Sequence, residues 1–297
     1  MMAISMSRDH MHKWIVCGTG SGTSVWDAEL RERIINVEGT DLVYTVDVSP
    51  DSTRFATGTD RREASVWSIS SGERLVGPPE QSDHVTGIRF SPDGEHIAVA
   101  CWGGSIRIFD SCTGRELIDI KTTIPSTRAN APLAWSNDGR RIFAVSYDNK
   151  IKCFEVSTGS LVAESLILDG IDVYGKVTSI ALATSGKFIA TYADRTISFL
   201  DASTLTQIGP AIEDSAKIYS IALSPDSTYL ATGLHDGKIS VRNLSLILPD
   251  SYTSPFKVSI CPFMTWLVRF YEPFISHLTH YVRHTLTRNN ELSNPRL

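Results

Sequence analysis

An internal repeat constrains the fold of this 297-residue chain more than any other feature of its sequence. Each copy contains an apolar run, a turn of the form Ser-Pro-Asp-Gly or a variant of it, and two further short apolar runs. Phased on the residue that begins this turn, the six copies start at Asp9, Ser49, Ser91, Ser136, Ala183 and Ser224. Successive copies are 40 to 47 residues apart. A period of roughly 40–45 residues with several short strands per unit is typical of a β-propeller.

The third copy shows why each unit is expected to be built from strands. Ile97 and Val99 are two residues apart, as are Ile106 and Ile108, and this spacing places apolar side chains on one face of a β-strand. In the turn between the first two runs, Pro92 fixes φ at the second position, and Asp and Gly tolerate the conformation that follows. We therefore predict an all-β fold of six four-stranded blades.

The column that ends the third run of each copy carries a family resemblance. It reads Trp-Asp at Trp26-Asp27, and elsewhere Trp67-Ser68, Phe109-Asp110, Phe154-Glu155, Leu200-Asp201 and Arg242-Asn243. Over about residues 3–245 the chain resembles the WD-repeat (WD40) family, which implies a β-propeller that holds other proteins. Two short strings, Leu75-Val-Gly-Pro-Pro79 and Ile208-Gly-Pro210, are similar to fourth strands of fungal NACHT-WD signalling proteins.

The chain departs from the family pattern in two ways. The Gly-His pair that precedes the first strand of WD repeats is missing in every copy, and its place in the third copy reads Glu80-Gln81. The buried His–Ser/Thr–Asp–Trp hydrogen-bond set of the family therefore cannot form in full, so we expect apolar packing between sheets to stabilise the blades. WD propellers commonly have seven blades, whereas six copies are visible here. Three alternatives are open for the ring. The tail caps the gap and so completes a seven-bladed ring, or six blades close alone, or the ring is incomplete and the chain is part of a larger assembly.

The pattern changes after the last copy, which predicts a propeller domain at residues 1–248 and a separate tail at residues 249–297. Apolar residues of the tail recur mostly at steps of three and four, at Phe263, Leu267, Phe270, Phe274, Leu278, Tyr281 and Leu286. This spacing predicts an amphipathic helix. Its apolar face is expected to cover an open blade edge or to pack under the ring, or else to contact a partner or a membrane surface. A third alternative is that this segment does not fold stably.

The net charge indicates which classes of partner the chain can bind, and the cysteines indicate its cellular compartment. The net charge is −5, with +3 on residues 251–297 and −8 on the remainder, and an acidic body repels nucleic acid. The five cysteines form no CxxC pair, which indicates a reducing compartment. The chain shows no signal peptide and no run of 18 uncharged apolar residues. We expect a cytoplasmic protein, with a nuclear location left open, and little membrane contact.

No motif in the sequence predicts a chemical reaction. A P-loop, a GxGxxG after a strand, a GxSxG elbow and a metal-spaced Cys/His cluster are all missing, so we expect no catalytic residue, cofactor or metal. The leading hypothesis is a non-enzymatic scaffold for protein–protein interactions. One form of this hypothesis makes the chain part of a larger assembly. Two alternatives are a propeller enzyme, either a hydrolase or a metal-dependent lactonase-like enzyme, and a lipid-surface adaptor that uses the C-terminal helix.

The loops that enter each blade and the hairpins between second and third strands share one face of such a propeller. We expect this face to form a partner-binding rim of Glu80, Asp83, Glu213, Asp214, Arg61, Arg62, Trp102, Tyr147 and His235. Exposed aromatic side chains anchor protein partners, and surrounding charges tune the rate of approach. The acidic character of the rim predicts a basic peptide or a basic patch on a protein as the partner.

Overall fold

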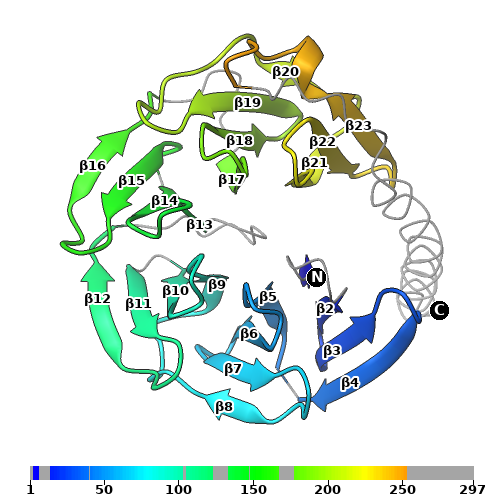
Figure 1. Cartoon of the computed structure of the whole chain (residues 1–297), viewed down its shortest axis with the longest axis vertical. Helices are drawn as coiled ribbons and strands as arrows, with labels where there is room; N and C mark the ends of the chain where they lie inside the picture. Colours follow the sequence, from blue (N-terminus) through cyan, green and yellow to red (C-terminus); the bar gives the residue numbers. More distant parts are fainter. Residues whose placement is uncertain are drawn as a thin grey trace, which may run out of the picture.

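Six small antiparallel sheets are arranged around a common centre in the computed structural model (Figure 1). The structure describes residues 3–6, 14–39, 41–102, 105–122, 133–146, 148–166 and 177–252. These residues form the strands β1 to β23 and one short 3₁₀ helix, η1 (Leu244–Leu246). The predicted tail from residue 253 onward lies outside the described residues. The β-propeller predicted from the repeat is thereby confirmed.

The first three blades each contain four strands in chain order. The first blade consists of β1 (Ala3–Met6), β2 (Trp14–Thr19), β3 (Gly22–Asp27) and β4 (Glu32–Glu38). The second consists of β5 (Val43–Val48), β6 (Arg54–Thr59), β7 (Ala64–Ser68) and β8 (Arg74–Val76). The third consists of β9 (Val85–Phe90), β10 (His96–Cys101), β11 (Ile106–Asp110) and β12 (Glu116–Ile120).

The remaining three blades continue in the same order. The fourth consists of β13 (Leu133–Trp135), β14 (Arg141–Val145), β15 (Ile151–Glu155) and β16 (Leu161–Glu164). The fifth consists of β17 (Val177–Leu182), β18 (Phe188–Ala193), β19 (Thr196–Asp201) and β20 (Ile212–Glu213). The sixth shows three strands within the described residues, β21 (Ile218–Leu223), β22 (Tyr229–Leu234) and β23 (Ile239–Asn243). Six blades thus match the six copies in the sequence.

The Ser-Pro-Asp turn is stabilised by its own side chains. In the second blade, Ser49 Oγ donates to the Asp51 carboxylate at 2.5 Å and accepts a hydrogen bond from the Arg54 amide at 2.9 Å. The fourth residue of the turn, Ser52, has φ of 56°, in the left-handed region that glycine adopts most easily. The turn therefore joins the first and second strands of a blade through local chemistry alone.

Apolar clusters fill the five junctions between consecutive blades. Between the third and fourth blades, Ile106 and Ile108 of β11 pack with Leu133, Trp135 and Phe154 of the next blade. Corresponding clusters lie at the other four junctions of the described chain. The apolar face of each blade is thus buried against the next one, as radial stacking requires.

A row of hydrogen bonds links the innermost strands of the first four blades. The buried carboxylate of Asp47 on β5 accepts hydrogen bonds from Ser5 Oγ at 3.2 Å and from the Phe90 amide at 2.9 Å. Trp135 Nε1 of the fourth blade donates to the Arg89 carbonyl of the third at 3.2 Å. These contacts fix neighbouring blades relative to one another. Separating the blades would leave the buried Asp47 carboxylate without its donors, which strongly destabilises the folded protein.

We predict that Ile108→Ala lowers the free energy of unfolding by about 2–5 kcal/mol, because the side chain is fully buried and its loss leaves a cavity. Leu161→Ala is the control: Leu161 on β16 is half exposed, and its truncation is expected to cost less than about 0.5 kcal/mol. Urea denaturation followed by circular dichroism measures both. Equal losses for the two variants would contradict blade-to-blade packing as the main stabilising force.

Candidate partner-binding face

Three aromatic side chains form a continuous row across the second and third blades. The imidazole of His84 lies 5.7 Å from the Trp102 ring and 6.2 Å from the Tyr44 ring, measured between ring centroids. Tyr44 lies on β5, His84 precedes β9, and Trp102 directly follows β10. We name this set the aromatic row. Trp102 is 37% exposed, so the row presents apolar surface to solvent at the loops predicted to form the rim.

Backbone contacts hold the aromatic row in place. The Trp102 amide donates to the His84 carbonyl at 2.9 Å, and His84 Nδ1 forms a hydrogen bond with the Asp60 carbonyl of the preceding blade. The Asp83 carboxylate accepts a hydrogen bond from the His84 amide at 2.7 Å. A surface whose side chains are fixed before binding loses less conformational entropy when a partner docks.

Charged side chains of the predicted rim surround the aromatic row. Arg61 forms an ion pair with Asp41 at 2.8 Å and is largely exposed. Arg62 and Glu80 are exposed, and the Arg62 carbonyl accepts a hydrogen bond from the Gln81 amide, which follows Glu80. The structure therefore brings Arg61, Arg62, Glu80, Asp83 and Trp102 together on neighbouring loops of the second and third blades.

Two further rim residues lie on the fifth and sixth blades. The imidazole of His235 lies 5.3 Å from the ring of Tyr219, which is half exposed. Glu213 on β20 is exposed and lies 3.6 Å from Arg195. Tyr147 lies outside the described residues. Tyr44, His84 and Tyr219 were missed from the sequence because their contacts depend on the packing of loops.

Asp214 is buried and supports the last blade. Its carboxylate accepts hydrogen bonds from Thr232 Oγ and from Arg242 Nη1, both at 2.7 Å. In the repeat pattern Asp214 stands where the family has its histidine, and Arg242 stands in the tryptophan column. An ion pair thus replaces the family's hydrogen-bond set in this blade. Because the carboxylate is enclosed by these two donors, we leave Asp214 out of the proposed binding surface.

The second blade retains part of the family's hydrogen-bond set. Trp67 Nε1 donates to Thr57 Oγ at 2.9 Å. The position of the histidine in this blade is occupied by Gly39, and in the third blade by Gln81, whose side chain accepts a hydrogen bond from Arg107 at 3.0 Å. The expectation that the full set is absent from these two blades agrees with these contacts.

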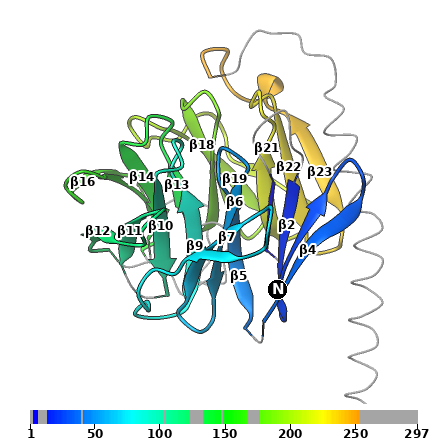
Figure 2. The ribbon, with the colours of Figure 1, turned by 60° about the horizontal axis from the view of Figure 1, so that its bottom comes forward.

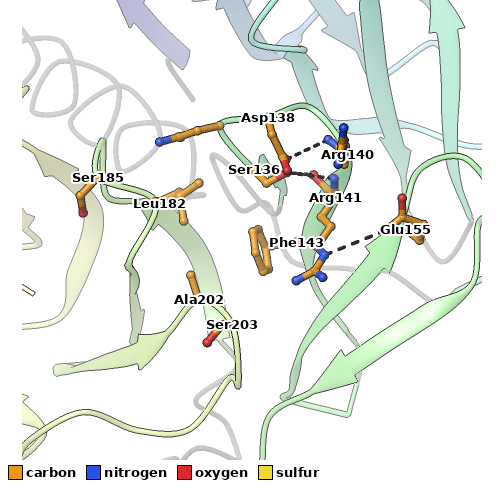
Figure 3. A pocket seen from close by; sticks show the side chains of 12 residues that line it. Ser136, Asp138, Arg140, Arg141, Phe143, Glu155, Leu182, Ser185, Ala202 and Ser203 are labelled. Atoms are coloured by element: carbon orange, nitrogen blue, oxygen red, sulfur yellow. Dashed lines mark hydrogen bonds and ion pairs between the residues drawn. The ribbon is translucent and has the colours of Figure 1, made fainter.

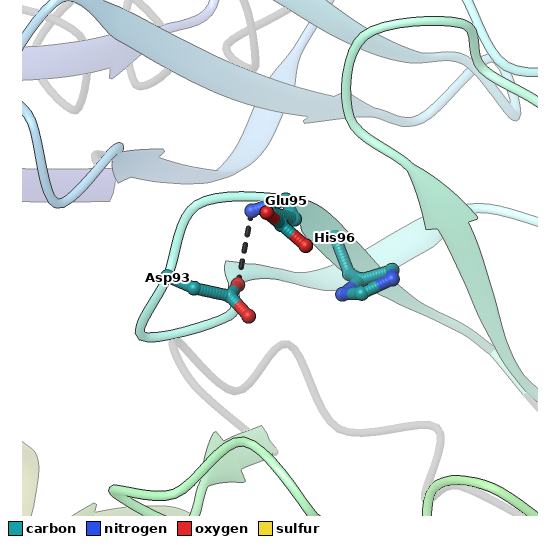
Figure 4. A group of neighbouring side chains, drawn as sticks. All are labelled: Asp93, Glu95 and His96. Carbon is teal, nitrogen blue, oxygen red and sulfur yellow. Dashed lines mark hydrogen bonds between the residues drawn. The ribbon is translucent and has the colours of Figure 1, made fainter.

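An acidic turn on the third blade resembles a metal site in composition. Asp93, Glu95 and His96 place ligand atoms within 4.8 Å of one another (Figure 4). The Asp93 carboxylate, however, accepts hydrogen bonds from Ser91 Oγ and from the Glu95 amide. Ser49, Ser136 and Ser224 make the same bond to an aspartate in their own turns. The position of Asp93 is therefore explained by the turn.

A groove of about 530 Å³ lies between the fourth and fifth blades (Figure 3). Arg141, Phe143 and Ala202 contribute to its wall, and Arg141 Nε lies 4.0 Å from Glu155. At the corresponding junction of the second and third blades, the Arg54 guanidinium donates hydrogen bonds to the Gly94 carbonyl and to the Ser111 hydroxyl, both at 3.0 Å. Ala202 occupies the place of Ser111 in the repeat, so the hydroxyl acceptor for Arg141 is missing at the later junction.

We predict that Arg242→Ala lowers the free energy of unfolding by about 3 kcal/mol, because it leaves the carboxylate of Asp214 buried without its cation. Arg61→Ala breaks an ion pair of almost the same length at the surface and is expected to cost less than about 1 kcal/mol. Urea denaturation of both variants gives the comparison. A similar small loss for both would show that Asp214 is solvated in solution.

The same carboxylate predicts a dependence of stability on pH. Burial alone would raise the pKa of Asp214, but the hydrogen bonds from Arg242 and Thr232 outweigh it and hold the pKa below its ordinary value. Its contribution to stability is therefore present above the unfolded-state pKa of about 3.9 and is lost as the pH falls through the lower folded-state value. Below about pH 4, the urea midpoint should fall less steeply for Asp214→Asn than for the wild type.

Comparison with known proteins supports the fold assignment. The family model for the WD domain, G-beta repeat, matches residues 32–68, 133–155 and 205–243, and that for the anaphase-promoting complex subunit 4 WD40 domain matches residues 53–128. Within the described residues, no helix is long and apolar enough to cross a membrane.

Two curated relatives have the same name, small ribosomal subunit protein RACK1. The protein from Caenorhabditis elegans is 32% identical over 151 residues, which are 48% of this chain and 46% of the relative. The protein from Drosophila melanogaster is 30% identical over 165 residues, which are 53% of this chain and 51% of the relative. The chain thus spans about half the length of these relatives. With its six radial sheets and the matches to its repeats, the chain carries WD40 repeats and folds as a WD40-type β-propeller.

Proposed function

We propose that this protein is a non-enzymatic interaction scaffold and that a protein or peptide partner docks on the aromatic row. The observation that carries this proposal is the partial exposure of Trp102 in contact with His84, on loops held by backbone hydrogen bonds. Tryptophan is among the residues that contribute most to protein–protein binding when a partner covers it. Aromatic side chains on fixed loops thus offer an anchor for a partner.

The charges beside the row favour a basic partner. Glu80 is exposed and Asp83 is partly exposed, whereas Arg61 is already paired with Asp41. Residues 1–250 carry a net charge of −8, which attracts basic surfaces and repels phosphate backbones. We therefore propose a basic peptide or a basic protein patch as the ligand, and protein in preference to nucleic acid.

The relatives and the cysteines support the proposed setting. RACK1 is by name a protein of the small ribosomal subunit, which agrees with a place for this chain in a larger assembly. Cys17, Cys101 and Cys153 are free and buried, and Cys112 is free and exposed, as expected in a reducing compartment. On these grounds we propose a cytoplasmic location. Whether the larger assembly is the ribosome is tested directly by asking whether the tagged protein sediments with ribosomes.

We predict that the double variant Trp102→Ala/His84→Ala loses partners that the wild type retains, because it removes the anchor of the proposed surface. Affinity purification with quantitative mass spectrometry should show at least a roughly ten-fold loss, matching a hot-spot contribution above about 1.4 kcal/mol. Leu75→Ala is the matched control, since Leu75 is half exposed on the outer strand β8. Partners lost equally from both variants, or from neither, would contradict docking on the aromatic row.

A charge-reversed variant tests the chemistry of the partner. Replacing Glu80, Asp83 and Glu213 together by lysine should slow association with a basic partner and weaken its dependence on salt, because these carboxylates attract it. The control reverses Glu29 and Glu32, which are exposed at the first blade. Stopped-flow or biolayer measurements at two salt concentrations compare the rates. An unchanged rate in the rim variant would exclude the basic partner.

A further inference from the structure

The last blade exposes a face that every other blade buries. The residue before the tryptophan column on the third strand is fully buried or nearly so in the first five blades: it is 0–1% exposed at Val25, Val66, Ile108, Cys153 and Phe199. In the sixth blade the equivalent residue, Val241, is 43% exposed. Ile239, two residues earlier, is also partly exposed, whereas its equivalent Ile106 is fully buried. The last blade therefore presents an interblade surface that the described chain leaves open.

The first blade presents the complementary face. Ile15 and Cys17 on β2 and Ala28 after β3 are buried and form a cluster of their own, with Met6 and Trp26 packed against it. In the second blade the residues equivalent to Ile15 and Trp26 are Phe55 and Trp67, which pack on the preceding blade with Val16 and Val25. The cluster of the first blade, in contrast, includes no residue of another blade in the part of the chain that the structure describes. We name it the receiving face.

These two faces flank one junction. The first and last blades are neighbours around the circle (Figures 1 and 2), and the other five junctions are filled by apolar clusters. An aliphatic face such as that of Ile239 and Val241 is stabilised when it is removed from water, by about 25 cal/mol for each Å² buried. An apolar occupant of this junction would therefore stabilise the exposed face of Ile239 and Val241.

We propose that the C-terminal segment of the same chain, residues 253–297, occupies this junction and contacts both the receiving face and the face of Val241. The segment has 45 residues, which is within the range of one repeat spacing, so it is long enough to take the place of one structural unit. Ten residues separate Tyr252 from the first apolar residue of its stripe, Phe263, and an extended chain of that length spans about 33 Å.

Composition and charge also support this occupant. Apolar residues at steps of mostly three and four predict an apolar stripe along a helix, of the kind that a surface helix buries against a core. Its net charge of +3 opposes the −8 of the propeller. The described chain ends beside the last blades, where Tyr252 Oη donates to Asp201 at 2.8 Å and the Ser251 carbonyl accepts from Lys187 at 2.8 Å. The segment therefore starts close to the fifth and sixth blades.

Cysteine alkylation in the full-length chain tests this proposal. Cys17 belongs to the receiving face, whereas Cys101 and Cys153 lie in clusters between other blades and serve as internal controls for folding. The test variant Phe270→Asp/Phe274→Asp places charges in the apolar stripe. The control variant Asn289→Asp/Asn290→Asp makes the same change in net charge outside it. The native protein is treated with iodoacetamide, and each cysteine is quantified by peptide mass spectrometry.

We expect Cys17 to react slowly in the wild type and in the control, and roughly ten-fold faster or more in the test variant, with Cys101 and Cys153 unchanged. If all three cysteines become reactive, the single variant Phe270→Ser is measured in the same way, with the same expectation for Cys17. Fast reaction of Cys17 in the wild type would overturn the proposal, as would equally slow reaction in all variants, which would indicate direct contact between the two blades. A dimer in light scattering whose dilution exposes Cys17 would instead assign the junction to a second copy.

Discussion

The contact between one blade's third strand and the next blade's second and third strands determines most of this structure. An aliphatic side chain such as Val66 or Ile108 is fully buried there against the aromatic column of its neighbour. This contact is repeated at the five junctions between consecutive blades, so each blade is stabilised by the blade beside it. The radial stacking of the blades depends on it, and Val241 of the last blade is exposed because the described chain does not provide this contact there.

The polar contacts that accompany this repeated apolar packing differ from blade to blade. The family's hydrogen-bond set is reduced to Trp67 and Thr57 in the second blade and replaced by Asp214, Thr232 and Arg242 in the sixth. An ion pair that is largely enclosed must have its hydrogen-bonding groups satisfied, and here Thr232 supplies the additional donor. The loops that enter the blades therefore differ in charge and in side-chain contacts, although the strands beneath them repeat. Because of this difference, the surface around the aromatic row is chemically distinct from the equivalent loops of the other blades.

The sequence predicted the parts of the structure that depend on local chemistry. The six units and the turn at Ser49 follow from alternation and turn residues, which act within a few positions of one another. The site was predicted less well, because its contacts join distant residues. His84 packs between Tyr44 and Trp102, and Arg242 reaches Asp214 from 28 positions away. The sequence did hold a signal for the ion pair of Asp214 and Arg242. Asp214 stands at the family's histidine position and Arg242 at its tryptophan position, and the signal is seen only when both positions are compared in the same repeat.

The buried carboxylate of Asp47 has a consequence for how a repetitive chain assembles in one order. Blades of similar shape and similar apolar faces could in principle stack on the wrong neighbour during folding. Asp47 accepts hydrogen bonds from the first blade and the third, while the equivalent positions of the last three blades carry alanine. An out-of-order pairing would enclose this charge without its donors, at a penalty that correct stacking avoids. One carboxylate therefore makes the second repeat non-interchangeable with the others and disfavours permuted arrangements of the ring.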